Sequence, residues 1–278
     1  MSSTAPAALP CAPVPTTPRM PTQDRPRLSA CIITLDEADR IDACLDSLVF
    51  CDEIVVVDSG STDGTRERAA AKGARVIEHA FEGYRAQKAF AVAAAAHDWV
   101  LCLDADERVT PALRASIERA RDAGFADAPG YRFARLTNYF GAPLRHGNAY
   151  PDRVLRLFDR RRGGWRGGRE IHEHASVDGT VATLRGDLGH DAYRSLADQL
   201  QRLERYACMM AEHMHARGRR ARVTNLLFNP WWRFVRGYFL RGGFLDGWRG
   251  FVYAYVEANY TAQKFIKLWL LERGHRIR

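Results

Sequence analysis

Short apolar runs alternate with amphipathic stretches over the first part of the chain. Each run is rich in aliphatic residues, many of them β-branched, which is typical of strands buried on both faces of a sheet. The four runs lie at residues 28–34, 53–58, 74–77 and 99–103. The stretches between them favour helices, because apolar residues recur there at helical spacing. This alternation predicts an α/β fold with a mostly parallel sheet, flanked by helices and joined by right-handed crossovers.

Three local signals mark where helices begin or end. After the first strand, apolar residues spaced four, seven and eight positions apart predict a helix over 41–49. Gly73 is expected to end the helix that follows the second strand. Thr110 followed by Pro111 predicts a helix start, since a hydroxyl caps the first turn and proline suits the first helical position.

The pattern changes after residue 130. Residues 131–136 and 153–158 predict two further strands. Residues 160–170 are dominated by Gly, Arg and Trp and predict a loop, and residues 171–190 predict short strands joined by turns.

Helical periodicity returns at Leu196 and continues to Met214, with Gly218 following as a helix-ending residue. Further on, residues 223–272 interleave Trp, Phe and Tyr with Arg and Lys. We therefore expect three parts. They are a disordered tail rich in Pro, Ala, Ser and Thr over 1–27, an α/β domain over 28–195, and a helical, basic and aromatic C-terminal extension over 196–278.

Polar side chains gather where three of the predicted strands end. Asp36 and Glu37 follow the first strand, Asp58 ends the second, and Asp104 and Asp106 follow the fourth. Ligands of parallel sheets bind beyond the carboxyl ends of the strands. The coincidence of three strand ends therefore predicts a binding site at this edge.

The pair Asp104 and Asp106 is the clearest candidate for metal binding. Carboxylates at a strand end can hold a hard divalent cation and leave positions open for phosphate oxygens. The alternative is a solvated acidic turn that caps the next helix. The position of the pair at the fourth strand end favours the metal.

The turn over residues 58–64 (DSGSTDG) offers a second group of polar atoms. Its glycine permits a ligand to approach closely, and its hydroxyls can bond to a sugar or a base. Asp63 has a plainer alternative role as the N-cap of the next helix. The sequence contains neither the dinucleotide-binding glycine fingerprint nor a P-loop.

Residues 171–174 (IHEH) do not have the spacing of a zinc protease, because His172 and His174 stand two positions apart. Along a strand they would share one face, with Glu173 on the other. Beside an acidic metal site, Glu173 could instead act as a general base.

Charge is concentrated near the C-terminus. The net charge is +8, and residues 185–278 contain 17 basic and 8 acidic residues, nearly all of the basic ones being Arg. Arginine suits phosphate-bearing surfaces. The arginines accompany Trp and Phe in apolar helical stretches rather than forming a polar stripe, which argues against a nucleic-acid partner. Six scattered cysteines without a Cys-x-x-Cys pair predict buried free thiols and a reducing compartment.

Taken together, residues 31–37 (CIITLDE), 54–65 (IVVVDSGSTDGT) and 99–107 (WVLCLDADE) resemble glycosyltransferase family 2, whose members have the GT-A fold. Five later motifs resemble one branch of that family, the lipopolysaccharide core β-1,4-glucosyltransferases and their relatives. These motifs are residues 150–152 (YPD), 156–158 (RLF), 171–173 (IHE), 186–190 (GDLGH) and 243–247 (GFLDG). The resemblance covers about residues 28–272.

The resemblance implies a nucleotide-sugar site. Thr34, Glu37 and Asp58 would line the nucleotide pocket, with Asp58 near the base. Gln87 and Lys88 match a polar pair that lies near the diphosphate or the base. At one position the chain departs from the wider family, since Asp36 stands where Asn is usual.

The resemblance also implies a metal and a base. Asp104 would face the ribose and the metal, and Asp106 would bind the Mg²⁺ or Mn²⁺ that bridges the diphosphate. His190 falls at the position of a late metal-ligand histidine. Glu173 falls at the position of the carboxylate that activates the acceptor, and Asp152 is the alternative base.

These assignments predict an inverting enzyme that transfers a sugar, glucose, from a nucleotide-diphosphate sugar. The acceptor would be the lipopolysaccharide core or another lipid-linked glycan. The arginines and aromatics of the extension suit an anionic membrane surface, which predicts a cytoplasmic protein held peripherally on the inner membrane face. The same aromatics would equally suit an ordinary core packed on the α/β domain.

Other functions remain open from the sequence. The same chemistry could serve a different lipid-linked or protein-linked acceptor. The chain could also be a non-catalytic protein that binds sugar nucleotides or nucleic acid. A nucleotidyltransferase of similar topology is a weaker alternative, because residues 31–37 lack a glycine-rich start.

Overall fold

The computed structural model describes residues 25–167 and 174–277. Within them, the first four strands are parallel neighbours, in the spatial order β3-β2-β1-β4. They are β1 (Leu28–Thr34), β2 (Glu53–Asp58), β3 (Arg75–Glu78) and β4 (Trp99–Asp104). The α/β class with a parallel sheet is confirmed, and each predicted strand lies within one residue of its expected bounds.

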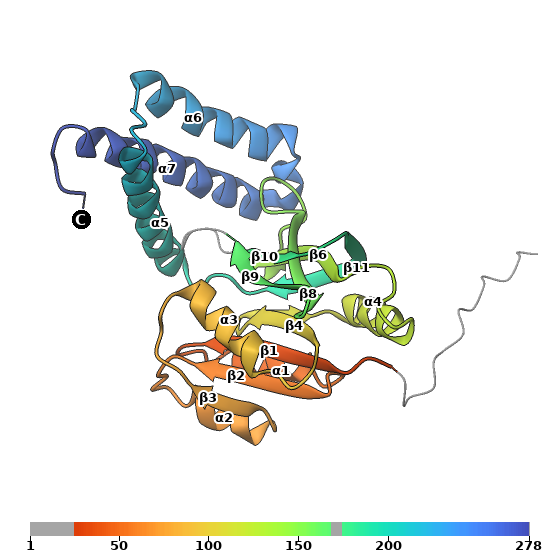
Figure 1. Cartoon of the computed structure of the whole chain (residues 1–278). Helices are drawn as coiled ribbons and strands as arrows, with labels where there is room; N and C mark the ends of the chain where they lie inside the picture. Colours follow the sequence, from red (N-terminus) through yellow and green to blue (C-terminus); the bar gives the residue numbers. More distant parts are fainter. Residues whose placement is uncertain (1–24, 168–173, 278) are drawn as a thin grey trace, which may run out of the picture.

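Helices cover both faces of this half of the sheet (Figure 1). They are α1 (Ile41–Asp46), α2 (Thr65–Ala71), α3 (Tyr84–Ala94) and α4 (Pro111–Asp122). Buried residues of α1 and α4, such as Leu45 and Ile117, pack in one core with Leu101 of β4. Ala91 of α3 packs in a second core with Val55 and Val100. The two cores hold β1 and β4 rigidly from both sides, and these strands position the site.

The predicted helix boundaries agree with the structure in two places and differ in one. The Thr110 hydroxyl accepts a hydrogen bond from the Leu113 amide at 3.3 Å and caps α4 as expected. Gly73 follows the end of α2 with a positive φ, also as expected. The predicted helix over 41–49 is too long, because α1 ends at Asp46 and Val49 is 65% exposed.

The remaining strands extend the sheet beyond β4 in the order β8-β6-β11-β5. They are β5 (Glu107–Val109), β6 (Gly130–Tyr139), β8 (Asp152–Asp159) and β11 (Val181–His190). β8 runs antiparallel to both β4 and β6, while β6 and β11 are parallel. β7 (Ala142–Pro143) pairs with β6 at its end. The sheet is mainly parallel at one end and mixed at the other, in a GT-A-like arrangement.

For residues 160–190, one expectation is wrong and another holds in part. A loop was expected over 160–170, but β9 (Gly163–Gly167) pairs there with β10 (His174–Val177). The buried side chain of Trp165 packs with Ala175, and this packing favours a strand despite the glycines on either side. The short strand and turn expected within 171–190 are present as β10 and the bend at residues 178–179, but β11 then continues for ten residues. Its pairing with β6 shifts register between Thr183 and Asp187, where Gly186, at φ +99°, lies close against the backbone of Leu113.

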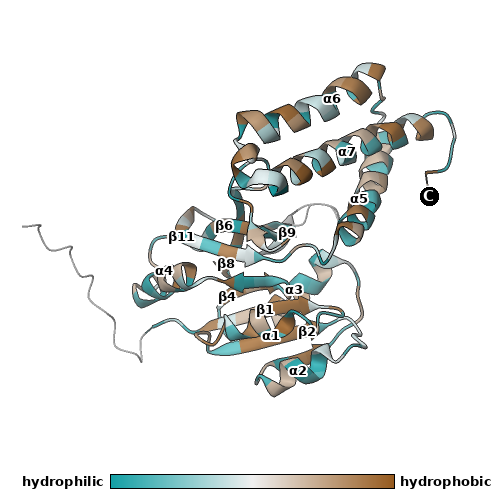
Figure 2. Ribbon diagram, turned by 180° about the vertical axis from the view of Figure 1, so that it is seen from behind, coloured by the Kyte–Doolittle hydropathy of each residue, from teal (hydrophilic) through white to brown (hydrophobic). Residues whose placement is uncertain are grey.

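The C-terminal region is helical, as predicted. It comprises α5 (Leu196–Ala216), α6 (Val223–Val235), a π-helical turn (Arg236–Leu240), a 3₁₀ turn (Gly243–Asp246) and α7 (Gly247–Leu271). Figures 1 and 2 show α6 and α7 side by side, with α6 on the side of α7 away from the sheet. In the described part of the chain, none of the helices combines the length and the apolar character that crossing a membrane requires.

The helices are attached to the sheet through a small core around Tyr139. Tyr139 is buried at the end of β6, and its hydroxyl donates to Gln199 of α5 at 2.7 Å. Asp246 accepts hydrogen bonds from the backbone and the ring of His146 at 2.9 and 2.8 Å.

At the other end of the chain, residues 1–24 of the expected disordered tail lie outside the described residues. The Pro26 carbonyl accepts a hydrogen bond from Arg121 of α4 at 2.6 Å.

Candidate active site

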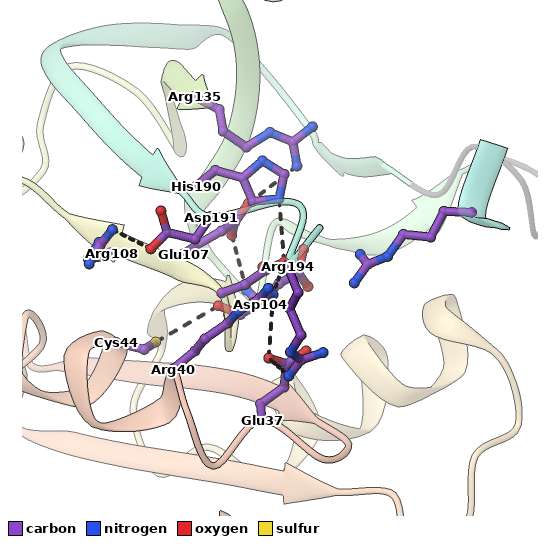
Figure 3. A network of polar contacts seen from close by, with 12 residues as sticks. Glu37, Arg40, Cys44, Asp104, Glu107, Arg108, Arg135, His190, Asp191 and Arg194 are labelled. Atoms are coloured by element: carbon purple, nitrogen blue, oxygen red, sulfur yellow. Dashed lines mark hydrogen bonds and ion pairs between the residues drawn. The ribbon is translucent and has the colours of Figure 1, made fainter. Parts of the chain in front are cut away.

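The carboxyl ends of β1, β4 and β11 meet on one side of the sheet (Figure 3). β1 and β4 are parallel neighbours, so Glu37 and Asp106 follow adjacent strand ends. β11 ends at His190, which lies opposite Glu107 of β5. The Asp191 amide donates to the Asp106 carbonyl at 2.9 Å, which ties β11 to the turn after β4. The edge predicted from the strand ends is therefore a real cluster of polar side chains.

Asp106 and His190 face one another in this cluster. Nε2 of His190 lies 3.6 Å from Oδ2 of Asp106, and both side chains are largely buried. Arg40 Nη1 lies 3.7 Å from the same carboxylate oxygen. Within the described residues, Oδ1 of Asp106 and Nδ1 of His190 are buried without a hydrogen-bond partner. Two of the three predicted metal ligands are thus brought together with unused binding capacity.

Asp104 is placed differently, between two cations of the protein. Lys88 Nζ lies 3.0 Å from Oδ1 of Asp104, and Arg156 Nη2 donates to Oδ2 at 2.8 Å. Burial alone would raise the pKa of Asp104, but the charges of Lys88 and Arg156 outweigh it and hold the pKa well below its usual range. Both cations also lie over the ring of Trp165. Asp104 is therefore a permanently ionised carboxylate that the protein already neutralises.

Arg156 connects Asp104 to a second buried carboxylate. Its Nη2 also donates to Oε1 of Glu107 at 2.9 Å, and Oε2 of Glu107 accepts from the Asp104 amide at 3.0 Å. Arg135 Nη1 lies 3.3 Å from Oε1 of Glu107. Glu107 is fully buried, so its charge depends on these arginines. The sequence analysis assigned no role to Glu107 or Arg135, and it placed Arg156 only within a family motif.

Replacing Arg156 with methionine is expected to destabilise the fold by about 3–5 kcal/mol, because it leaves buried carboxylates without their counter-charge. Methionine keeps much of the volume, so the loss reflects charge rather than packing. Urea unfolding of both proteins measures the effect. Arg132→Met is the matched control, since Arg132 is exposed and should change stability by less than about 0.5 kcal/mol. Equal stabilities for the two variants would refute the bridging role of Arg156.

The residues expected to line the nucleotide pocket lie at the ends of β1 and β2. Asp58 is fully buried, and its carboxylate accepts hydrogen bonds from the amides of Gly60 and Ser61 at 2.9 and 2.8 Å. Gly60 has φ +99°, which this tight turn requires. Oγ1 of Thr34 is buried without a partner within the described residues. Burial raises the pKa of Glu37 to about 7, against the opposing charges of Arg194 and Arg40.

The two residues of the polar pair on α3 make different contacts. Gln87 is fully buried, and its amide donates to Ser59 Oγ at 3.0 Å and to the His79 carbonyl at 3.1 Å. It therefore fixes the turn after β2, while Lys88 reaches Asp104. Both residues lie beside the cluster, on its α3 side.

Asp36 and Asp63, two further acidic residues near the site, hold neighbouring loops together through hydrogen bonds. Asp36, at φ +52°, accepts from the Thr62 amide at 2.8 Å and links the loop after β1 to the turn after β2. Asp63 is not the N-cap of α2, because Gly64 occupies that position. Its carboxylate instead accepts from the amides of Thr65 and Ala38, at 3.0 and 2.9 Å.

Of the two candidate bases, one is described. Glu173 lies outside the described residues, as does His172. Asp152 begins β8 and is 45% exposed, and Oδ2 accepts from Nη2 and Nε of Arg135 at 2.7 and 2.9 Å. Arg135 therefore links the Asp152 carboxylate to Glu107. Glu107 in turn accepts the hydrogen bond from the Asp104 amide.

Arg194 is a site residue that the sequence analysis did not find. It stands between β11 and α5, and its Nη2 lies 2.9 Å from both Glu37 and Asp39. Figure 3 shows Arg194 and Glu37 pointing toward one another. Nη2 also donates to the Asp36 carbonyl at 2.9 Å. One arginine therefore joins the loop after β1 to the start of the C-terminal helices, a contact that no local sequence pattern predicts.

Comparison with known proteins identifies this arrangement. The family model described as glycosyl transferase family 2 matches residues 29–180. The chain belongs to glycosyltransferase family 2. The membership expected from residues 31–37, 54–65 and 99–107 is confirmed. Of the cluster, Glu37, Asp104 and Asp106 lie inside the matched region, whereas His190 and Arg194 lie beyond it.

Two relatives extend the family match over most of the chain. Lipopolysaccharide core biosynthesis glycosyltransferase LpsC of Rhizobium meliloti (strain 1021) is 33% identical over 250 residues, which are 85% of this chain and 92% of LpsC. The uncharacterized glycosyltransferase RP128 of Rickettsia prowazekii (strain Madrid E) is 28% identical over 87% of this chain and 86% of that protein. The resemblance to lipopolysaccharide core transferases is thereby confirmed.

Among solved structures, glucosyl-3-phosphoglycerate synthase from Mycobacterium tuberculosis, in complex with Mn²⁺, uridine diphosphate and glucosyl-3-phosphoglycerate, is similar to this family 2 chain. The match is 20% identical, covers 71% of this chain and 81% of that one, and has a TM-score of 0.45.

Two residues of this family 2 site offer donor atoms to a metal ion, which is fewer than a complete coordination shell needs. In the described ranges, no group of three or more His, Cys, Asp or Glu side chains is arranged to hold an ion alone. Asp106 and His190 nevertheless face one another, and Oδ1 of Asp106 is buried without a partner. An oxygen and an imidazole nitrogen leave room for phosphate oxygens to complete the coordination of a hard cation. The donor set therefore fits a divalent metal shared with a phosphorylated substrate.

Proposed function

We propose that this chain is an inverting glycosyltransferase that moves glucose from a nucleotide-diphosphate sugar onto the lipopolysaccharide core. The observation that carries the proposal is the facing pair Asp106 and His190, next to Asp104, at the strand ends of a family 2 chain. The 33% identity to LpsC over most of both chains supports the acceptor class. The choice of glucose rests on the resemblance to the core β-1,4-glucosyltransferases.

Asp106 and His190 would hold the Mg²⁺ or Mn²⁺, and Asp104 would lie beside it. When bound, such an ion supplies positive charge where the diphosphate gains negative charge. Lys88 and Arg156 keep Asp104 ionised and fixed in position, so that its carboxylate meets an incoming ribose without reorganising. Asp104 is already paired with two cations of the protein, whereas Oδ1 of Asp106 has no hydrogen-bond partner among the described residues.

The nucleotide would lie across the ends of β1 and β2. Thr34 offers a buried hydroxyl without a partner, and the carboxylate of Asp58 fixes the turn against which the base would rest. Glu37 would lie at the edge of this pocket, joined to Arg194. Gln87 would act by holding the turn after β2 in place.

Glu173 is the proposed general base that takes the proton from the acceptor hydroxyl. In the sequence it lies between β9 and β10, directly before His174. Asp152 is the alternative, and its Oδ2 accepts both hydrogen bonds from Arg135. One of these carboxylates is enough for an inverting transfer, since each reaction needs a single deprotonation of the acceptor.

A lipopolysaccharide acceptor is anchored in a membrane by its lipid part. We therefore place the protein in the cytoplasm, where it would bind peripherally to the inner membrane face and reach an acceptor presented there. No nucleic acid takes part in this scheme.

Deletion of the gene tests the proposed function in the cell. The core oligosaccharide of the deletion strain should be shorter by at least one hexose, measured by mass spectrometry and linkage analysis. The wild-type gene should restore the core, and a gene carrying Asp106→Ala should not. A core of unchanged mass and linkage would refute the proposed acceptor and leave family membership intact.

A further inference from the structure

Helix α6 is largely apolar but contributes little to a core, where Leu226 is only partly buried against α5 and α7. Eight of its 13 residues are apolar, but none of them is buried in the structure. Leu227 is 72% exposed and Trp231 is 57% exposed. A helix of a globular protein normally turns its apolar stripe toward a core. Here only one side of α6 rests on α7, and the other side faces away from the protein (Figure 2).

The exposed apolar surface continues into the next segments of the chain. We call it the aromatic face and define it by its exposed large apolar residues, from α6 to the first half of α7. They are Val223, Leu227, Phe228, Trp231, Trp232, Phe239, Leu240, Phe244, Leu245, Trp248, Phe251 and Tyr255. A run of this length exceeds the scattered apolar residues that ordinary surfaces carry, and such surfaces mark interaction sites.

The aromatic face carries positive charge and almost no negative charge. Between Glu212 and Glu257 the sequence contains a single acidic residue, Asp246. That side chain is nearly buried and is held by His146. The exposed arginines of the same stretch are Arg217, Arg219, Arg220, Arg222, Arg236 and Arg241. Within the described structure, exposed apolar side chains are therefore combined with exposed arginines from the segments that precede and follow α6.

A cationic cavity lies where α5, α7 and the segment leading into α6 meet. Its volume is about 460 Å³, and its lining includes Arg217, Arg219 and Lys264 together with Met214 and Phe265. Among the described residues that line it there is no carboxylate. Burial, together with the charges of Arg233 and Arg219, lowers the pKa of Lys264 against the opposing charge of Glu257. The cavity suits the phosphate of an anionic headgroup.

We propose that the aromatic face docks onto a lipid bilayer that contains anionic lipids, with α6 lying in the plane of the interface. Its Trp, Phe and Leu side chains would enter the boundary between headgroups and acyl chains, and the arginines would bind the phosphates. Trp is well suited to this depth because its ring is apolar and its N–H is polar. The inference deepens the proposed function, since a lipid-linked acceptor lies in the same bilayer.

A second copy of this chain is a poorer occupant of the same surface. In a two-fold dimer the patch would meet itself. Two sets of six exposed arginines would then face one another with almost no acidic partner, and like charges repel. An anionic bilayer satisfies the apolar side chains and the arginines together.

Vesicle co-sedimentation with the full chain tests the proposal. The wild type should bind vesicles of phosphatidylcholine with phosphatidylglycerol, and bind phosphatidylcholine alone at least tenfold more weakly. The double variant Leu227→Glu/Trp231→Glu should lose at least tenfold in binding to the anionic vesicles. Val49→Glu is the matched control, because Val49 is a similarly exposed apolar residue on the α/β part, and it should bind like the wild type.

The contribution of charge is measured separately with Arg219→Ser/Arg220→Ser/Arg222→Ser. Each arginine near an anionic surface adds about fivefold in binding, so the triple variant should bind on the order of 100-fold more weakly. Wild-type binding should also weaken with added salt. Equal binding to both vesicle types would overturn the anionic part of the proposal, and no binding to either would overturn all of it.

Tryptophan fluorescence with brominated lipids gives a second readout that needs no variant. Trp231, Trp232 and Trp248 are exposed on the aromatic face, whereas Trp99 and Trp165 are buried elsewhere. Bromine near the glycerol end of the acyl chains should quench the wild-type emission. Absence of quenching in bound protein would overturn the docking orientation. A dimer that the Leu227→Glu/Trp231→Glu variant abolishes, without any vesicle binding, would assign the face to a second copy.

Donor turnover separates this proposal from the proposed function. Hydrolysis of a soluble sugar nucleotide without acceptor should be the same for the wild type and the Leu227→Glu/Trp231→Glu variant, within twofold. Vesicle binding without any donor turnover would refute the transferase and leave the docking surface standing. Donor turnover without vesicle binding would refute the docking surface and leave the transferase standing.

Discussion

Replacing Asp106 with alanine is expected to lower turnover by at least about 1,000-fold while the protein stays folded. A Lewis-acidic metal ion contributes several kcal/mol to transition-state stabilisation, and Asp106 is the proposed ligand with unused binding capacity. The residue follows β4 rather than lying within it, so its loss removes little packing. Steady-state assays with saturating Mg²⁺ or Mn²⁺ measure the effect, and thermal unfolding verifies the fold.

Asp127→Ala provides the control for this experiment. Asp127 is exposed and lies outside the site, so that variant should keep wild-type turnover. Retention of more than a tenth of wild-type turnover by Asp106→Ala with excess metal would show that the metal assignment is wrong. His190→Ala should also weaken metal binding, since His190 faces the same carboxylate.

Glu173→Gln is expected to lower kcat by about 100- to 10,000-fold, the usual contribution of a well-placed general base. The donor KM should stay nearly unchanged, because the change removes a proton acceptor and no contact to the nucleotide. Glutamine keeps the size and most of the hydrogen-bonding capacity of glutamate. Initial rates over a range of donor and acceptor concentrations separate the two constants.

Asp152→Asn is the comparison that decides between the two candidate bases. If Glu173 is the base, Asp152→Asn should lower kcat far less than Glu173→Gln does. A large loss of kcat in Asp152→Asn, together with near wild-type kcat in Glu173→Gln, would move the base to Asp152. An increase in donor KM alone for Glu173→Gln would place Glu173 in the donor site instead.

The parallel half of the fold follows from the sequence because its signals are local. The apolar runs of β1 to β4 are bounded by turn residues, and the strands match them within one residue. The Thr110 cap is likewise a property of adjacent residues. β9 was missed for the opposite reason. Its glycines suggest a loop, and only the distant partner β10 and the core around Trp165 make it a strand.

The site residues likewise fall into two groups, those that the order of the strands predicts and those that depend on distant parts of the chain. Asp104 and Asp106 could be found because topology places strand ends together, whatever the side chains are. Arg156 and Arg135 could not be placed, because they come from β8 and β6, which join the sheet out of chain order. Their pairing with Asp104 and Glu107 depends on the antiparallel entry of β8 beside β4. Arg194 reaches Glu37 across even more of the chain.

For the C-terminal helices, the sequence predicts the secondary structure but not which aromatic residues are buried. Periodicity predicts that 223–272 is helical, and it is. Whether its aromatic residues form a core or a surface depends on what packs against them. The structure gives both answers, since Tyr253 packs near Tyr139 whereas Trp231 and Trp248 are exposed.

The most direct test of the account is transfer of labelled glucose by the purified full chain from a nucleotide-diphosphate glucose to lipopolysaccharide isolated from the deletion strain. The assay is run after treatment with EDTA and again after Mg²⁺ or Mn²⁺ is restored. The account predicts that label enters the lipopolysaccharide only with metal, and that Asp106→Ala transfers none. Failure to transfer glucose or any other hexose under these conditions, by a chain that is folded, would contradict it.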